Sequence, residues 1–250
     1  MQDQTVTETS RRNVLKGAIA GAAGVTGLAV AGTALWSKGS VHAAASTAKC
    51  HPDTPATILA IAATAEQLAI TFYTHGIKNA HKLAISGQNL DYLTAAVVEE
   101  QYHLNLLVKA GGKPVTGKFS FPHGEATFEH QDKFINTLDQ LETAFESAYI
   151  AAIRDFALLG LPDYAVLSAQ ILTIEAEHRA LGRSISSSIP VANNWAFTPV
   201  YVKSVADAAK VLGAEGYLTP KDKNSYTYAP VSLMLNKNVK QTVPYVVACS

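Results

Sequence analysis

The chain has 250 residues, of which 48% are hydrophobic and 16% are charged, and its formal net charge is zero. This apolar fraction is that of a globular protein, and the lack of a basic surplus argues against a nucleic-acid partner. The two cysteines, Cys50 and Cys249, form no C-x-x-C motif. The sequence therefore argues against a zinc ribbon, a rubredoxin-type iron centre and an iron–sulfur cluster.

The first 45 residues are typical of an export signal rather than of a fold. Arg11 and Arg12 precede a Gly/Ala/Val-rich stretch at 17–36, and three alanines at 43–45 offer a cleavage site. The arginine pair predicts a twin-arginine signal peptide at 1–45, with the twin-arginine export machinery as a partner. We expect a periplasmic or other extracytoplasmic location. The alternative is a membrane anchor, because an uncleaved stretch of ~20 residues is long enough to span a bilayer.

Four segments with helical spacing of apolar residues follow, at 54–86, 91–109, 129–159 and 163–188. Asp53 or Thr54 can cap the first helix, and Pro55 suits its first position. Short turns at 86–89 and 160–162 join the first helix to the second and the third to the fourth. The connection at 111–128 is long and rich in glycine and proline.

These lengths predict an all-α fold. Short turns make neighbouring helices antiparallel, so the expected architecture is a four-helix bundle with one long crossover between helices 2 and 3. The bundle is expected at 54–189, and no alternating strand pattern occurs before residue 195. Residues 190–250 contain several prolines and tyrosines and one plausible short helix at 202–212. They predict a mostly irregular C-terminal extension that packs on the bundle.

Two E-x-x-H motifs lie on the second and fourth helices. Glu100 and His103 form the first motif, and Glu175 and His178 form the second. Residues at i and i+3 leave the same face of a helix. A carboxylate and an imidazole at this spacing allow one helix to supply two ligands to a metal ion.

The first and third helices share a different spacing. Glu66 lies seven residues before Tyr73, and Glu142 lies seven residues before Tyr149. Seven residues make two helical turns, so each glutamate shares a face with its tyrosine. Both glutamates also lie on apolar stripes, where a lone carboxylate is costly unless it is paired or bound to a metal.

The two spacings repeat in the same order along the chain. Glu66 and Glu100 are 34 residues apart, and Glu142 and Glu175 are 33 residues apart. The chain thus reads as two copies of one helical hairpin, each with Glu, Tyr and then E-x-x-H. Packed with pseudo-two-fold symmetry, the hairpins would bring four carboxylates and two imidazoles into one core cavity.

A simpler alternative is that these glutamates are surface charges on amphipathic helices. Glu99, Glu146 and Glu177 lie close to the proposed ligands in sequence but lack the repeated spacing. Glu146 is the strongest competitor, because it lies four residues from Glu142 and could take its place.

Four carboxylates and two histidines suit iron or manganese, with zinc also compatible and calcium disfavoured by the imidazoles. We therefore expect two Fe or Mn ions that share two-electron chemistry with oxygen or peroxide. Tyr73 and Tyr149 are the candidate catalytic residues, either by hydrogen bonding to ligand carboxylates or as radical sinks. The alternative is that both are ordinary core tyrosines.

The same residues carry a resemblance to a known family. The matching motifs are AEQLAITFY at 65–73, EEQYH at 99–103, GGKP at 111–114, LE at 141–142 with AY at 148–149, and IEAEH at 174–178. Over about residues 54–189 the chain resembles the ferritin-like superfamily, in particular bacterial ferritin-like domain proteins related to plant desiccation-related proteins.

This resemblance implies a ferritin-like four-helix bundle with a di-iron or di-manganese centre. The implied ligands are Glu66, Glu100, His103, Glu142, Glu175 and His178. The chain departs from related proteins in having no rubredoxin-like cysteine segment, which puts electron delivery of that kind in doubt. The tail after residue 190 puts assembly into a cage in doubt.

Three functions are compatible with these observations. The first is an exported redox metalloprotein with a role in stress protection. The second is a non-catalytic desiccation or stress-protective scaffold without stoichiometric metal. The third, metal storage in a shell, requires a large oligomer rather than a monomer or homodimer. In an oxidising compartment Cys50 and Cys249 would either join the two ends of the mature chain or remain free.

Overall fold

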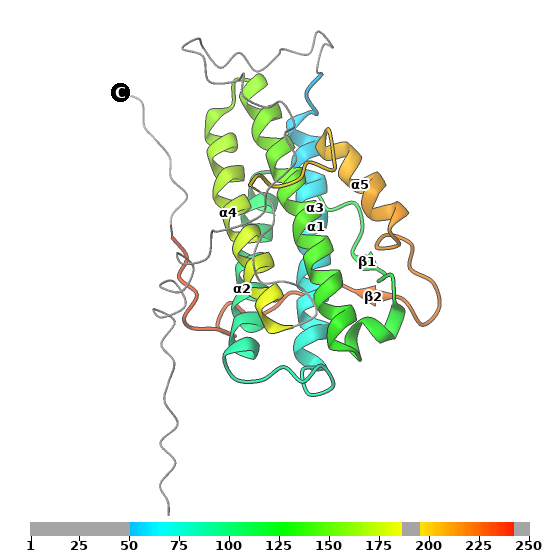
Figure 1. Cartoon of the computed structure of the whole chain (residues 1–250). Coiled ribbons are helices and arrows are strands. Elements are labelled where there is room, and N and C mark those ends of the chain that lie inside the picture. Colours follow the sequence, from blue (N-terminus) through cyan, green and yellow to red (C-terminus); the bar gives the residue numbers. More distant parts are fainter. Residues whose placement is uncertain (1–50, 187–195, 243–250) are drawn as a thin grey trace, which may run out of the picture. The chain divides into compact units, whose positions relative to one another are not determined.

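Four long helices make up most of the part of the chain that the computed structural model describes, residues 51–186 and 196–242 (Figure 1). They are α1 (Pro55–Lys78), α2 (Gln88–Lys109), α3 (Gln131–Leu158) and α4 (Pro162–Ile185). The predicted signal peptide at 1–45 lies outside the described residues, as do both cysteines, so these interpretations stay predictions.

The four helices form two hairpins. α1 packs along α2 and α3 packs along α4, while smaller contacts between α1 and α3 and between α2 and α4 join the hairpins. The residues between α2 and α3 make the single long crossover. The all-α bundle with its crossover between the second and third helices is therefore confirmed.

The crossover contains secondary structure that the sequence analysis missed. Strand β1 (Lys118–Phe119) pairs antiparallel with β2 (Tyr226–Thr227), and the short 3-10 helix η2 (Gly124–Phe128) follows β1. The sequence has no alternating strand pattern before residue 195, so this short strand was not predicted. Two residues are too few to give an alternating pattern, and the partner strand lies more than 100 residues away in sequence.

Local capping explains where the first two helices begin and end. Thr54 Oγ1 accepts a hydrogen bond from the Thr57 backbone N–H at 3.2 Å and caps α1, as one of the two predicted candidates. α1 ends at Lys78 rather than near residue 86, because Asn79 follows it and donates its side-chain N–H to the His75 carbonyl at 2.9 Å. α2 starts at Gln88, three residues earlier than expected, directly after a glycine with φ +56°.

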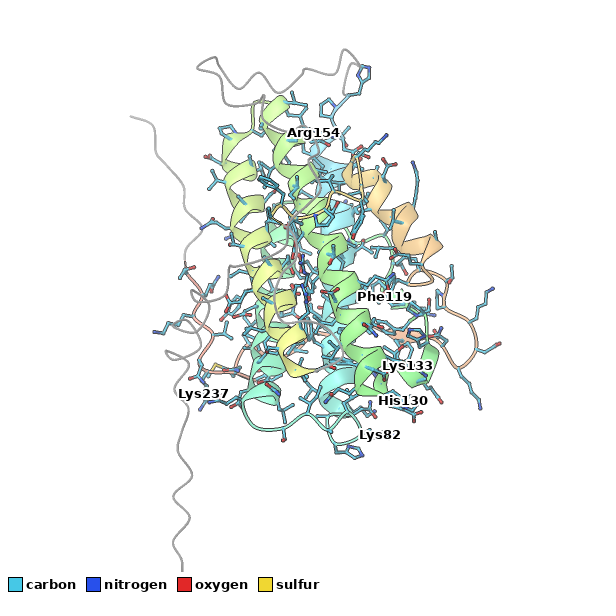
Figure 2. The ribbon with its side chains drawn as sticks, in the orientation of Figure 1. Lys82, Phe119, His130, Lys133, Arg154 and Lys237 are labelled. Carbon is cyan, nitrogen blue, oxygen red and sulfur yellow. The ribbon has the colours of Figure 1, made fainter. Side chains whose placement is uncertain are left out.

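The C-terminal part adds one helix, α5 (Val205–Ala214), close to the predicted position. It packs on α1 and α3. Asp53, just before α1, accepts a hydrogen bond from the Ala206 backbone N–H at 2.8 Å and donates its own N–H to Asp155 at 3.1 Å. Asp155 also pairs with Arg154, which Figure 2 shows at the opposite end of the bundle from Lys82. These contacts hold α5 against the first turn of α1.

A cluster of aromatic rings fills the space between α1, α3 and the crossover. Phe72 stacks on Phe134 with ring centroids 4.5 Å apart, and Phe121 and Phe128 pack against Phe72. Tyr226 of β2 contacts both Phe121 and Phe128. Large buried rings of this kind contribute strongly to core stability.

Helix α1 is the only helix of the described part whose length and composition would let it cross a membrane. In this fold 72% of its most apolar window is buried inside the protein, as expected of a core helix.

Two glycines test how tightly this core is packed. A Cβ at Gly76 would lie 2.5 Å from the Phe134 ring, whereas a Cβ at Gly213 in α5 would meet no atom within 4 Å. We expect Gly76→Ala to destabilise the protein by about 1–3 kcal/mol through overpacking. Gly213→Ala is expected to stabilise it by about 0.5–1 kcal/mol, because alanine restricts the unfolded chain. Urea unfolding of the metal-free proteins measures both changes. Equal effects of the two substitutions would contradict the packing.

Candidate metal centre

The six residues singled out by their spacing converge in the middle of the bundle, from all four long helices. Their potential ligand atoms form two groups, and within each group these atoms all lie within 4.8 Å of one another. The first group is Glu66, Glu100, His103 and Glu175, and the second is Glu100, Glu142, Glu175 and His178. We call the six residues together the carboxylate–histidine cluster.

Glu100 and Glu175 belong to both groups, and each presents one oxygen to each side. His103 Nδ1 lies 3.1 Å from Glu100 Oε2 and 3.5 Å from Glu175 Oε1. His178 Nδ1 lies 3.2 Å from Glu100 Oε1 and 3.5 Å from Glu175 Oε2. Glu66 completes the His103 side and Glu142 the His178 side. The cluster thus has two adjacent positions for cations, with two carboxylates shared between them.

The cluster is buried, and many of its polar atoms have no hydrogen-bond partner. His103 has the most exposed side chain of the six, at 12%. The buried atoms of the cluster that make no hydrogen bond within the described residues are Glu100 Oε1, Glu142 Oε2, both carboxylate oxygens of Glu175, and His178 Nδ1. The contacts of the histidines with these oxygens of Glu100 and Glu175 are ion pairs of 3.2–3.5 Å. Buried polar atoms normally find partners, because leaving them unpaired costs free energy. These atoms are mostly oxygens and surround the two positions, so the donor set fits hard or intermediate cations such as iron and manganese.

Without a cation the carboxylates of the cluster oppose one another's ionisation. Burial raises the pKa of Glu66 well above its ordinary value, and the neighbouring Glu100 and Glu175 raise it further. Burial likewise raises the pKa of Glu142. Burial also opposes the ionisation of Glu100, but His178 and His103 outweigh it and lower its pKa. In the metal-free cluster, ionisation of Glu66 and Glu142 is therefore less favourable than that of an exposed glutamate.

Both histidines are held in the charged form by the carboxylates around them. Burial lowers the pKa of His103, but the neighbouring carboxylates of Glu100, Glu175 and Glu66 raise it well above the ordinary value. Burial acts in the same direction on His178, where Glu100 and Glu175 again raise the pKa. Protons and cations thus compete for the same donor atoms.

Tyr73 and Tyr149 each donate a hydrogen bond to a glutamate of the opposite hairpin. The Tyr73 hydroxyl donates to Glu142 Oε1 at 2.5 Å, and the Tyr149 hydroxyl donates to Glu66 Oε1. The spacing of seven places each tyrosine on the face of its own glutamate, but the contact is made across the interface between α1 and α3. Burial raises the pKa of both hydroxyls, so they remain protonated donors.

Tyr92 is a neighbour of the cluster that the sequence analysis missed. Its hydroxyl donates to the His178 backbone carbonyl at 2.7 Å and lies 3.3 Å from the Tyr73 hydroxyl. It lies eight residues before Glu100, and the corresponding position before Glu175 is Leu167. The repeat therefore carries no signal for it.

Glu99 also contacts the cluster, although it lacks the spacing that the six cluster residues share. Its Oε2 lies 2.9 Å from His178 Nε2, so the other ring nitrogen, Nδ1, faces the cluster. A carboxylate on the far nitrogen of a histidine fixes the ring and makes it a better metal ligand. The corresponding residue next to Glu175 is Ile174. The two halves of the cluster therefore differ in how their histidines are held.

Glu146, the strongest competitor of Glu142, belongs to neither group of potential ligand atoms. Its carboxylate accepts two hydrogen bonds from Arg179 Nη1, at 2.9 and 3.0 Å, and both side chains are buried. The matching positions in the other hairpin are the buried Ile70 and Leu104. An ion pair thus occupies one half where an aliphatic pair occupies the other. Glu177, the third glutamate that lacks the repeated spacing, is exposed.

The comparison with known families agrees with this geometry. The family model of the ferritin-like domain matches residues 54–188, more than half of the chain. No curated protein and no solved structure matches the chain significantly. A ferritin-like bundle with a buried glutamate–histidine cluster that could hold metal ions is what the residues and their positions show. The chain belongs to the family of ferritin-like domains.

Proposed function

We propose that the chain is an exported two-metal oxidoreductase that uses iron or manganese and reacts with oxygen or peroxide. The observation that carries this proposal is the set of buried carboxylate and imidazole atoms that have no hydrogen-bond partner and face a common centre. Burying four carboxylates together is unfavourable unless cations balance them.

Each residue of the cluster has a role in this proposal. Glu66 and His103 would hold one ion and Glu142 and His178 the other, while Glu100 and Glu175 belong to both groups and would contribute to both. A bound pair of iron or manganese ions would supply the two electrons that reduction of oxygen to hydrogen peroxide, or of hydrogen peroxide to water, requires.

The remaining neighbours position the ligands. Tyr73 and Tyr149 donate to one oxygen of Glu142 and Glu66, which leaves the second oxygen of each carboxylate for the ion. Glu99 holds the His178 ring through its far nitrogen. Burial of the cluster excludes bulk water, which strengthens every electrostatic interaction inside it.

The twin-arginine pattern at 1–45 supports export, and a stress-protective role outside the cytoplasm is the physiological setting that we propose. A relation to desiccation-related proteins belongs to the same proposal, since it depends on the motifs of the sequence alone. A scaffold without stoichiometric metal is the alternative. The buried ligand atoms without a hydrogen bond count against this alternative, because a scaffold without metal has no use for them.

Metal content tests the proposal directly. We expect about two Fe or Mn ions per chain in protein purified from its native export route. Glu100→Gln combined with Glu175→Gln is expected to remove both ions, because these two residues belong to both groups. Elemental analysis measures the stoichiometry, and Glu177→Gln on the exposed face of α4 is the matched control.

The stability of the double variant separates loss of metal from loss of fold. Without metal the double variant is expected to fold, because glutamine keeps the shape of glutamate. The two substitutions remove the charges of Glu100 and Glu175 that oppose the ionisation of Glu66 and Glu142, and they also remove partners of His103 and His178. Wild-type protein without stoichiometric metal would favour the scaffold. Tight binding of both ions by the double variant would refute the assignment of the bridging residues.

Metal affinity is expected to fall as the pH is lowered. The pKa values of Glu66, Glu142, His103 and His178 are raised in the metal-free protein, so protons occupy these donors at a higher pH than usual. Binding must displace these protons. Calorimetry in buffers with different ionisation enthalpies should therefore detect protons released with each metal ion. A binding reaction that releases no protons would contradict the assigned ligands.

Glu99 is expected to make the two metal positions unequal. Glu99→Ala should weaken the ion held by His178 by about 10–100-fold and leave the ion held by His103 nearly unchanged. Glu99→Gln, which keeps an acceptor for the ring N–H, should have a smaller effect. Metal titrations should then show two separated binding steps. Equal weakening of both steps would contradict a role through His178.

A further inference from the structure

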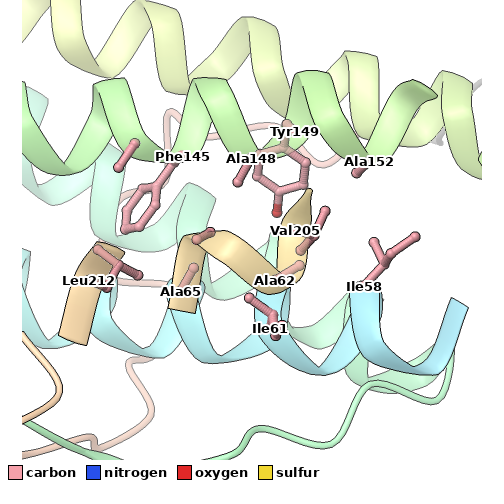
Figure 3. A pocket seen from close by; sticks show the side chains of 12 residues that line it. Ile58, Ile61, Ala62, Ala65, Phe145, Ala148, Tyr149, Ala152, Val205 and Leu212 are labelled. Carbon is pink, nitrogen blue, oxygen red and sulfur yellow. The ribbon is translucent and has the colours of Figure 1, made fainter. Parts of the chain in front are cut away.

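A cavity lined by small and aliphatic side chains lies between α1, α3 and α5 (Figure 3). Its volume is about 20 Å³, enough for one molecule the size of water. The walls consist mainly of alanine, isoleucine, leucine and valine side chains. Tyr149 and Phe145 on α3 supply the aromatic part of the wall, opposite Ala62 and Ala65 on α1.

The cavity offers a polar molecule nothing to bind. The lining contains one polar side chain, Tyr149, and its hydroxyl already donates to Glu66. A buried water needs two to four polar partners, and cavities that lack them stay dry and take up apolar molecules or gases. The chemistry of the lining therefore selects a small neutral molecule that makes no hydrogen bonds.

Larger residues take several of the positions that match this lining in the other half of the bundle. Ala62 and Ala65 lie four residues and one residue before Glu66, and the matching positions before Glu142 are Leu138 and Leu141. Both leucines are buried in the core.

The second wall shows the same difference. Ala148 lies six residues after Glu142, and the matching residue after Glu66 is Phe72, which stacks on Phe134. Ala152 lies ten residues after Glu142, and Gly76 matches it. A Cβ at Gly76 would touch the Phe134 ring, so no comparable space remains there. Alanines leave a cavity on the Tyr149 side, whereas aromatic rings occupy the matching positions on the Tyr73 side.

Tyr149 links the cavity to the carboxylate–histidine cluster. Its ring forms part of the wall, and its hydroxyl bonds to Glu66 on the His103 side. That side also holds the histidine with the more exposed side chain, 12% for His103 against 1% for His178. A molecule in the cavity would lie one side chain away from the more accessible metal position.

We propose that this cavity binds dioxygen, and that dioxygen rather than peroxide is the oxidant of the centre. Dioxygen is small, neutral and apolar, as the lining requires. Hydrogen peroxide would bring two O–H donors into a space without a free acceptor. The choice of oxidant rests on the proposed function, whereas binding of dioxygen in the cavity does not need the metal.

Dioxygen is paramagnetic, so it can be located directly in the metal-free full chain by NMR under oxygen pressure. The methyl protons of Ala62, Ala148 and Ala208, which line the cavity, are expected to relax several-fold faster than those of Ala209. Ala209 is the matched control, because it is the next residue on α5 and is outside the lining. Equal relaxation of cavity and control methyl groups would overturn the proposal.

Ala208→Leu fills the cavity from α5 without touching the cluster. The variant is expected to lose the oxygen-dependent relaxation and, when loaded with Fe(II), to react several-fold more slowly with oxygen. Its metal stoichiometry and its rate with hydrogen peroxide should match those of the wild type. Ala209→Leu should behave as the wild type throughout. Ala152→Val, a smaller insertion in the same cavity, replaces Ala208→Leu if that variant fails to fold.

The outcomes separate this inference from the proposed function. Relaxation of the cavity methyl groups in a protein that binds no metal would support the cavity and refute the oxidoreductase. Two metal ions per chain without such relaxation would support the metal centre and refute the binding of dioxygen in the cavity. An unchanged oxygen rate in the filled variant, or equal slowing with oxygen and with peroxide, would refute the role of the cavity.

Discussion

The burial of four carboxylates in one small volume is the constraint on which the rest of the structure depends. Each of the four long helices supplies one of them, and none is exposed to water that could balance its charge. Two imidazoles and two tyrosine hydroxyls compensate part of the charge. Several of these buried oxygens still accept no hydrogen bond from the described residues. Cations at the two positions between them would balance the charge and tie the two hairpins together.

Pseudo-two-fold symmetry organises the ligands, but the surroundings break it. Glu99 supports His178, while Ile174 occupies the matching position near His103. The Glu146–Arg179 ion pair likewise occupies positions that in the other hairpin belong to two buried aliphatic residues. Two metal ions in such a centre would have the same set of ligands and different environments. Unequal affinity and unequal access follow from this difference.

Much of this could be predicted from the sequence, since helical spacing and turn residues are local. The six cluster residues were found because the spacings of each hairpin place them on one face. The crossed contact between Tyr73 and Glu142 depends on how α1 meets α3, which no spacing within one helix reveals. Glu99 and Glu100 are adjacent glutamates, and only the packed bundle shows that Glu99 turns to His178. The pairing of β1 with β2 joins distant two-residue segments without a pattern of their own.

The two segments that cover the bundle explain why the cavity lies on only one side of it. The crossover and β2 cover the Tyr73 side with aromatic rings that pack against one another. Helix α5 covers the Tyr149 side, and its small and branched side chains meet alanines of α1 and α3. Helix α5 thus forms one wall of the cavity without supplying any of the six cluster residues. With the cavity as the dioxygen site that we propose, a change in α5 would alter the reaction with oxygen and leave the ligands in place.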